Sequence, residues 1–258
     1  MIAVVMAVCN RIQNVRMAIH SWSLQTNQDF TLIVADDGST DPIEQLVQTY
    51  APRMSIAYCR QEGPQGVAVN LNHASRFVTD DYIWYTDGDI IFNPGAVESA
   101  CSHIQTHPDR VIAGRYDWMR EQVITEIDIE HDFGKLAASV FSLDHRKPLW
   151  FKHKLAEKCN AILGANFIIP RQAYWDVGGW DENIPGSNAN DCDFGWCLSD
   201  EGYKLLTCDC IMGYHQWHPS DGDTKKLGAA RALPYIFRKH GQPVPVQWQP
   251  YDEGGPLG

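Results

Sequence analysis

Apolar runs of five to seven residues alternate with amphipathic helical patterns through the first 115 residues, and this alternation limits the folds open to the chain. Such runs are typical of strands that are covered on both faces of a parallel sheet. After the first run, Ile12, Val15, Ile19 and Trp22 recur at the spacing of one helix face. The expected strands cover residues 2–8, 30–35, 54–59, 82–86 and 110–115. Repeated strand–helix–strand units predict an α/β fold with a mostly parallel central sheet flanked by helices.

Polar residues at the ends of the apolar runs predict where helices begin. Asn10 is expected to cap the first helix, and Asp41 to cap the second, with Pro42 at its first position. The alternation weakens after residue 115, and the elements of residues 116–160 cannot be placed. Further strands are expected at 162–170 and 203–208, and helices from 190 and over 225–240, before a Pro/Gly-rich tail at 242–258. No repeat or linker is evident, so a single domain is expected.

Charge and hydropathy exclude two broad classes of protein. The 258 residues include 21 Lys and Arg against 32 Asp and Glu, which gives a net charge of −11. Nucleic acids are bound through clustered basic residues, so no nucleic-acid partner is expected. No apolar stretch approaches the roughly 20 residues of a membrane span, and the apolar N-terminus lacks the basic start of a signal peptide. We therefore expect a cytoplasmic protein without a transmembrane segment, for which peripheral membrane contact stays open.

The eight cysteines carry little sign of a structural role. Without a secretion signal they are expected to be reduced thiols. Cys208 and Cys210 are two residues apart, and no Cys-x-x-Cys pair occurs. Zinc ligation by cysteine is therefore not expected.

Two acidic turns follow expected strands. Asp36 and Asp37 come after the second strand, and Asp87-Gly88-Asp89 follows the fourth. In an open parallel sheet, ligands bind beyond the carboxyl ends of the strands. Carboxylates there can accept hydrogen bonds from a base or ribose, and can hold Mg²⁺ or Mn²⁺ against a diphosphate. Asp and Gly are also common turn formers, but two such turns at one sheet edge favour a ligand site.

Four sequence motifs, taken together in their order along the chain, resemble those of one known family. They are Ala35-Asp36-Asp37-Gly38-Ser39-Thr40-Asp41, Asp87-Gly88-Asp89, Gly178-Gly179-Trp180-Asp181-Glu182 and Asn190-Asp191-Cys192-Asp193-Phe194-Gly195. Over roughly residues 1–220 the chain resembles glycosyltransferase family 2, whose members are inverting enzymes of the GT-A fold. The resemblance implies one catalytic domain, with a nucleotide-binding half at 1–115, an acceptor and catalytic half at 116–220, and a C-terminal helix and tail at 221–258.

The resemblance also implies roles for individual residues. Asp37 matches the aspartate that binds the nucleotide base, Asp87 would lie near the ribose, and Asp89 would be the main metal ligand. Asn72 falls in the helix where family members place an asparagine near the nucleotide. Asp191, at the start of a late helix, matches the catalytic base, and the helix N-terminus would stabilise its anionic form.

Further contacts are expected on either side of these residues. Ala7 and Cys9 end the first strand, and Cys9 stands where family members often have a ring beside the base. Trp180 and Asp181 are expected to contact the donor or acceptor sugar, because aromatic faces pack on sugar rings and carboxylates accept bonds from hydroxyls. The alternative is that Trp180 belongs to the core.

A histidine late in the chain completes the metal site in many GT-A enzymes. Here His215 is the first choice and His218 the second, with a histidine packed beside Trp217 as the alternative. The expected cofactor is Mn²⁺ or Mg²⁺, since a neutral imidazole beside carboxylates suits such an ion.

The expected activity is metal-dependent, inverting transfer of a sugar from a nucleotide-diphosphate donor, with a UDP-sugar favoured, to a hydroxyl of a glycan or glycolipid. No Gln-x-x-Arg-Trp motif occurs, so single addition is expected rather than polymer synthesis. One rival is a sugar-nucleotide pyrophosphorylase, but residues 9–13 lack the glycine-rich loop of that class. The other is a non-catalytic nucleotide-sugar or carbohydrate-binding module, which would not need Asp191.

Overall fold

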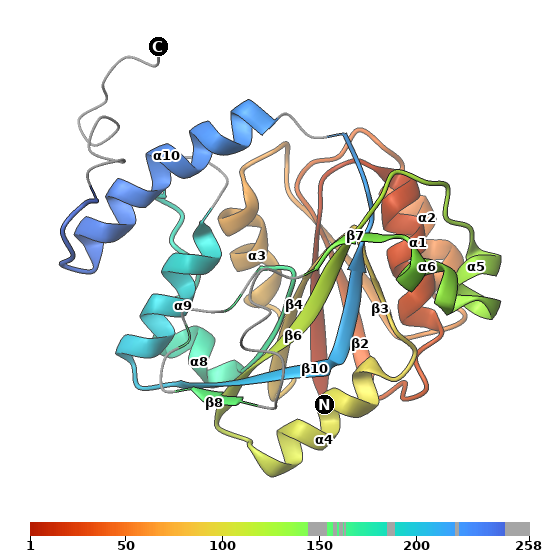
Figure 1. The fold of residues 1–258 in the computed structure, drawn as a ribbon, viewed down its shortest axis with the longest axis horizontal. Helices are drawn as coiled ribbons and strands as arrows, with labels where there is room; N and C mark the ends of the chain where they lie inside the picture. The colour runs from red at the N-terminus through yellow and green to blue at the C-terminus, as the bar shows by residue number, and fades with distance from the viewer. Residues whose placement is uncertain are drawn as a thin grey trace.

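The computed structural model describes residues 1–143, 154–156, 159, 162, 164–184, 189–219 and 222–245. Within these residues, ten strands form one sheet with helices on both faces (Figure 1). The order is β3-β2-β1-β4-β9-β6-β10-β5, with β7 beside β6 and β8 beside β10. The strands are β1 (Ile2–Val8), β2 (Phe30–Asp36), β3 (Ile56–Arg60), β4 (Tyr82–Asp87), β5 (Ile90–Phe92), β6 (Arg110–Met119), β7 (Val140–Ser142), β8 (Lys154–Ala156), β9 (Asn166–Pro170) and β10 (Lys204–His215).

The sheet is parallel in its first half and mixed in its second. β1 pairs in parallel with β2 and β4, and β2 pairs in parallel with β3, which confirms the prediction for this half. β9 lies antiparallel between β4 and β6, and β5 is antiparallel to β10. The sheet beyond β4 is therefore mixed and not mostly parallel: β10 pairs in parallel with β6, whereas its other strand pairs there are antiparallel. An apolar run does not encode strand direction, and the pattern of residues 116–160 was too weak to indicate the reversal.

The helices are α1 (Ile12–Ser23), α2 (Ile43–Tyr50), α3 (Val67–Ser75), α4 (Ala96–Thr106), α5 (Glu126–His131), α6 (Phe133–Ala138), α8 (Arg171–Asp176), α9 (Asn190–Asp200) and α10 (Gly222–Lys239). Both predicted N-caps are wrong. The Asp41 carboxylate accepts the backbone N–H of Ile12 at 3.0 Å, so it caps α1 instead of α2. The side-chain oxygen of Asn10 accepts the backbone N–H of Thr40 at 2.8 Å, so Asn10 joins the two loops. Asp41 reaches the start of α1 because the loops after β1 and β2 lie side by side.

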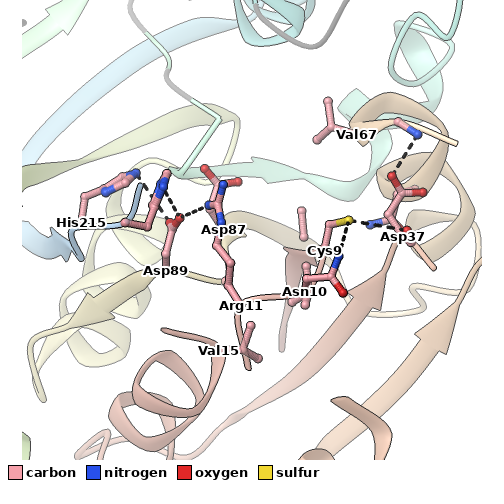
Figure 2. Close-up of a pocket in the computed structure, with 15 residues that line it drawn as sticks. Cys9, Asn10, Arg11, Val15, Asp37, Val67, Asp87, Asp89 and His215 are labelled. Carbon is pink, nitrogen blue, oxygen red and sulfur yellow. Dashed lines mark hydrogen bonds and ion pairs between the residues drawn. The ribbon is translucent and has the colours of Figure 1, made fainter. Parts of the chain in front are cut away.

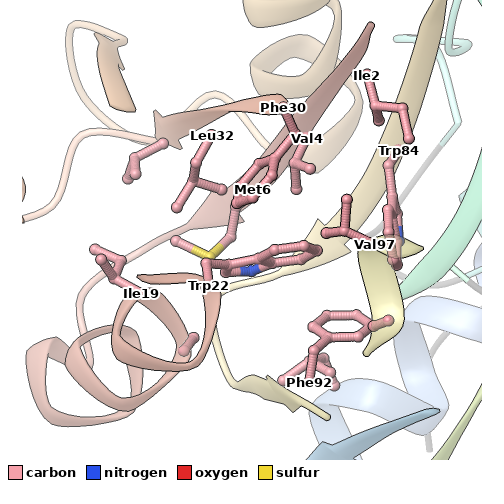
Figure 3. Close-up of a cluster of buried hydrophobic side chains, with 14 of the residues drawn as sticks. Ile2, Val4, Met6, Ile19, Trp22, Phe30, Leu32, Trp84, Phe92 and Val97 are labelled. Atoms are coloured by element: carbon pink, nitrogen blue, oxygen red, sulfur yellow. The ribbon is translucent and has the colours of Figure 1, made fainter. Parts of the chain in front are cut away.

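Two hydrophobic layers cover the sheet. On the α1 face, Trp22 has its ring centroid 4.6 Å from that of Phe92 and 5.1 Å from that of Trp84 (Figure 3). The layer beneath α3, α8 and α9 includes Tyr85, Phe167, Trp180 and Phe194. Burial on both faces explains why the central strands are continuous apolar runs. This packing holds the carboxyl ends of β1, β2 and β4 in fixed positions.

A disulfide joins Cys208 and Cys210 in β10. The expectation that all the cysteines are thiols is therefore wrong for this pair, because side chains two apart on a strand point to the same face. The pairing of β10 with β6 shifts register between Cys208 and Met212, so the pair lies at a bulge. In the described part of the chain, no helix combines the length and the apolar character that crossing a bilayer requires.

Candidate active site

The carboxyl ends of β1, β2 and β4 open onto a cavity of about 400 Å³ (Figure 2). It is lined by Ala7, Val8, Cys9, Asn10, Arg11, Val15, Asp37, Gly66, Val67, Asn70, Asp87, Gly88, Asp89, His215 and His218. All the nucleotide and metal candidates named from the sequence are among these residues, except Asn72. The structure therefore brings together side chains from the two ends of the chain at the edge of the sheet where ligands bind in open α/β folds.

The two carboxylates of the first acidic turn have different roles. Asp36 is fully buried and accepts hydrogen bonds from Ser39, Tyr58 and Arg60, so it stabilises the turn. The carboxylate of Asp37 lies at the cavity and accepts the backbone N–H groups of residues 65 and 66, at 2.7 and 2.9 Å. Asp37 therefore fixes the loop that enters α3, and its carboxylate forms part of the cavity wall.

Gly38 allows this turn to form. Its φ is +72°, a region in which side chains other than glycine are strained, and a Cβ added there would lie 2.4 Å from the backbone of Gly63. The turn and the loop before α3 are therefore in direct backbone contact. That contact brings Asp37 within hydrogen-bonding distance of the loop.

The second acidic turn places Asp89 opposite two histidines. Nε2 of His215 lies 3.7 Å from Oδ1 of Asp89, and Nε2 of His218 lies 3.4 Å from its Oδ2. One ligand atom from each of the three residues falls within 4.8 Å of the others. Asp89 Oδ1 is buried and has no hydrogen-bond partner among the described residues, which is costly unless a cation or proton donor satisfies it. The donor set of one carboxylate and two imidazoles fits Mn²⁺.

Backbone carbonyls fix the orientation of both imidazoles. Nδ1 of His215 lies 2.9 Å from the carbonyl oxygen of Gln216, and Nδ1 of His218 lies 2.9 Å from that of Pro219. A carbonyl only accepts, so each Nδ1 carries a hydrogen and each Nε2 is the ring nitrogen left on the side of Asp89 to ligate a metal. This is the usual arrangement behind metal-ligating histidines. Burial lowers the pKa of His218, which favours the neutral form that can ligate a metal.

Arg11 is a member of the site that the sequence analysis missed. It lies in the left-handed backbone region with φ of 59°, directly before α1. Its guanidinium lies 3.2 Å from Oδ2 of Asp89 (Figure 2). The signal available was a basic residue immediately after the first strand. A cation at this position can balance the Asp89 carboxylate or a bound diphosphate.

A smaller cavity of about 200 Å³ adjoins the first and contains Asp191. Asp87 and Val67 line both cavities, so they form the boundary between them. Asp191 lies in the first turn of α9; its Oδ2 accepts the backbone N–H of Gly164 at 3.0 Å. Its Oδ1 accepts the N–H of Cys192 at 2.9 Å. Asp191 is thus a half-buried carboxylate held by backbone donors at the N-terminus of α9.

Asn72 and Trp180 lie deeper than expected. The side-chain amide of Asn72 donates to the carbonyl of Trp180 and accepts the N–H of the same residue, both at 2.8 Å. Asn72 thereby fixes the Gly178-Gly179 turn and is absent from the cavity lining. Trp180 is buried, and its ring stacks on that of Phe194 with centroids 4.3 Å apart. Trp180 also reaches the wall of the smaller cavity, so a sugar contact by Trp180 stays a prediction.

Asp181 and Asp193 both bind the end of α10. Lys239 Nζ lies 2.8 Å from a carboxylate oxygen of each. Burial raises the pKa of Asp181, but hydrogen bonds from Lys239, the Asn183 backbone and Tyr235 outweigh it and lower the pKa to about 2. Asp193 is also paired with His240 at 2.9 Å and is nearly inaccessible. These contacts make Asp193 an anchor for α10, and they occupy the carboxylate that a general base would need free. The sugar contact expected for Asp181 stays a prediction.

Asn70 is the second residue that the sequence analysis missed. Its amide nitrogen donates to the carbonyl of Ala35 at 2.8 Å, which fixes the side-chain orientation. Its Oδ1 is buried and has no hydrogen-bond partner in the described part of the chain. Asn70 also lines the larger cavity. Two asparagines lie on α3, at positions 70 and 72, and the pattern alone did not show which one faces the ligand cavity.

Comparison with known sequences agrees with this geometry. Residues 3–177 match the model of the family described as Glycosyl transferase family 2. Validoxylamine A glucosyltransferase of Streptomyces hygroscopicus subsp. jinggangensis is 25% identical over 273 residues, covering 95% of this chain and 62% of that protein. Chondroitin synthase of Escherichia coli is 25% identical over 245 residues, covering 83% of this chain and 36% of that protein. The chain thus spans slightly less than two thirds of the first relative and about a third of the second.

Solved structures share the fold at low sequence identity. S. aureus TarS 1-349 in complex with UDP-GlcNAc superposes with a TM-score of 0.71 at 14% identity, covering 93% of this chain and 65% of that one. The mannosyltransferase PcManGT of Pyrobaculum calidifontis, in complex with GDP-Man and Mn²⁺, gives 0.67 at 16% identity, covering 97% and 67%. These neighbours identify the fold as GT-A. With the family match over more than half of its length, the chain belongs to glycosyltransferase family 2.

Proposed function

We propose that this enzyme is a divalent-metal-dependent, inverting glycosyltransferase that adds a single sugar from a UDP-sugar to a hydroxyl of a glycan or glycolipid. The observation that supports this best is the Asp89 carboxylate beside the Nε2 atoms of His215 and His218, with its buried Oδ1 lacking a hydrogen-bond partner among the described residues. Both TarS and PcManGT have been solved with a nucleotide sugar, and PcManGT also with Mn²⁺. The proposal carries these ligand classes to this chain; the cytoplasmic location stays a prediction.

The nucleotide is proposed to occupy the larger cavity. Asp37 would accept hydrogen bonds from the base and Asp87 would lie near the ribose, between the two cavities. Ala7 and Cys9 would form the floor at the end of β1. In place of Asn72, we propose Asn70 as the asparagine that meets the nucleotide, because Asn70 lines the cavity and its Oδ1 has no hydrogen-bond partner among the described residues.

The reaction requires that the leaving diphosphate is stabilised and that the acceptor hydroxyl loses its proton. Asp89, His215 and His218 would hold a divalent ion, which when bound neutralises negative charge on the diphosphate. Arg11 lies beside Asp89 and can donate to the same diphosphate. Asp191 would accept the proton of the acceptor hydroxyl as its oxygen attacks the anomeric carbon from the side opposite the leaving diphosphate. This single displacement inverts the anomeric centre, and protonated Asp191 returns its proton to solvent.

The two histidines can be separated by substitution. We expect His215→Ala to reduce Mn²⁺ affinity and turnover more than His218→Ala does, because His215 is held at the end of β10. Each loss should be at least about tenfold, since even residues behind a metal ligand commonly contribute that much. Calorimetry with Mn²⁺ and UDP measures it, with exposed His131→Ala as the control. A Mn²⁺ complex in which neither His215 nor His218 contacts the ion would reject the assignment.

Asp37→Ala should weaken UDP binding about 10- to 100-fold, the range that corresponds to losing a charged hydrogen bond worth roughly 1.5–3 kcal/mol. The variant also leaves two backbone N–H groups of the loop before α3 without an acceptor. Melting temperature must therefore be measured beside calorimetry with UDP. Glu62→Ala removes the same charge from an exposed position of that loop and should leave both unchanged. Parental affinity in a folded Asp37→Ala variant would refute the base-binding role.

A further inference from the structure

A second group of metal-ligating atoms lies where α4 packs against β10, outside the residues that line the two cavities described above. Nε2 of His103, Sγ of Cys208 and Sγ of Cys210 all lie within 4.8 Å of one another. Nε2 of His103 is 3.2 Å from Sγ of Cys210. Cys208 is buried, whereas His103 and Cys210 are half-buried. The group is thus sheltered on one side and reachable from solvent on the other.

The local backbone favours thiolates at this position. The backbone N–H of Cys210 points at Sγ of Cys208, 3.3 Å away, and a donor of this kind stabilises a negative sulfur. The strand keeps both sulfurs on one face of β10, and α4 supplies the imidazole opposite them. Two sulfurs and one nitrogen form a ligand set for Zn²⁺ and similar thiophilic ions, whereas Mg²⁺ and Mn²⁺ prefer oxygen.

We propose that His103, Cys208 and Cys210 bind one thiophilic cation of the Zn²⁺ class when the disulfide between the two cysteines is reduced. A dithiol reductant supplies two electrons and two protons, the S–S bond breaks to give two thiols, and the dithiol itself becomes a disulfide. Binding of the cation then displaces both thiol protons to solvent. Water completes a four-coordinate site. In the oxidised form both sulfurs of this group are in the disulfide, so His103 is the good ligand that this group retains, and binding depends on the redox state.

This site is distinct from the proposed catalytic one in both ligands and cation. β10 leads from Cys210 to His215, so a single strand carries ligands of both groups. The two groups should prefer different ions, because the Asp89 group includes a carboxylate and no sulfur. The proposal does not depend on the glycosyl-transfer reaction, and its test needs no activity measurement.

Cobalt(II) is the probe, because it replaces Zn²⁺ and gives a near-ultraviolet charge-transfer band only when thiolate sulfur binds it. The full chain is reduced with a dithiol, which is then removed without oxygen, and is titrated with Co²⁺ in excess Mg²⁺. We expect the band to saturate at one Co²⁺ per chain and to be absent before reduction. Cys210→Ser should abolish the band, and His103→Gln should weaken Co²⁺ affinity at least about tenfold. Cys101→Ser, which removes another half-buried thiol from α4, should change nothing.

Circular dichroism before and after reduction establishes that the fold survives. Absence of the band in the folded, reduced chain would overturn the proposal, as would a band that persists in Cys210→Ser. Unfolding on reduction would also overturn it, since the three ligands would no longer be assembled. A band of equal intensity without reduction would refute the redox dependence.

Discussion

Asp89→Ala is expected to abolish metal-dependent donor binding and to lower sugar transfer by more than about 100-fold. Loss of a residue that only supports a metal ligand commonly lowers affinity or activity about 10- to 100-fold, and loss of a ligand itself should cost more. Asp89 supplies the carboxylate of the three-residue group and the buried oxygen that has no hydrogen-bond partner in the described part of the chain. Without it, His215 and His218 alone cannot balance the charge of a divalent ion. Calorimetry with UDP in the presence of Mn²⁺, and again after chelation, measures the effect.

Asp29→Ala is the matched control for Asp89→Ala, because it removes the same side chain from an exposed position before β2. It should bind UDP and Mn²⁺ like the parent. The Asp89→Ala variant should remain folded, since it removes a buried charge that lacks a full set of partners. If Mn²⁺ still enhanced UDP binding as it does in the parent, the metal ligand would have to be another residue.

Asp191→Asn is expected to keep donor binding and to lower transfer by roughly 10²–10⁴-fold, the span attributed to general-base catalysis. The amide keeps the shape of the carboxylate and one oxygen that can accept the N–H of Gly164, but it cannot take a proton. Melting temperature should therefore change little. The measurement is the transfer rate at saturating donor, together with the dissociation constant for UDP.

Glu201→Gln is a suitable control, since it makes the same chemical change at the exposed C-terminal end of α9. Near-parental transfer by Asp191→Asn would show that Asp191 only orders the Gly164 backbone. Unfolding of the variant would show instead that this hydrogen bond stabilises the fold. Asp193 could not replace Asp191 as the general base without losing its pairs with Lys239 and His240.

The strand ends were predictable because burial leaves a strong trace in sequence. β1 is an uninterrupted apolar run, and the apolar runs of β2 and β4 stop at the acidic turns that carry Asp37 and Asp89. The motif after residue 189 likewise located the start of α9. Such features are local, so a single sequence reveals them.

The missed features all depend on contacts between distant segments. Asn70 and Asn72 are two residues apart on α3, yet one faces the cavity and the other binds the turn at Trp180. Arg11 joins the site only because the residues before α1 adopt a left-handed backbone and lie against the β4 turn. The pairing of Asp181 and Asp193 with Lys239 required α10 to pack against α9, which no local pattern encodes.

Release of UDP from a UDP-sugar tests the central claim most directly. The full chain is incubated with a panel of UDP-sugars, first with Mn²⁺, then with a chelator, and finally with Mn²⁺ restored in excess. We expect slow release of UDP from at least one sugar donor with Mn²⁺, loss of release on chelation, and recovery when Mn²⁺ returns. Release that is unaffected by chelation would contradict the metal-dependent mechanism, and binding of UDP-sugars without any release would contradict catalysis by this site.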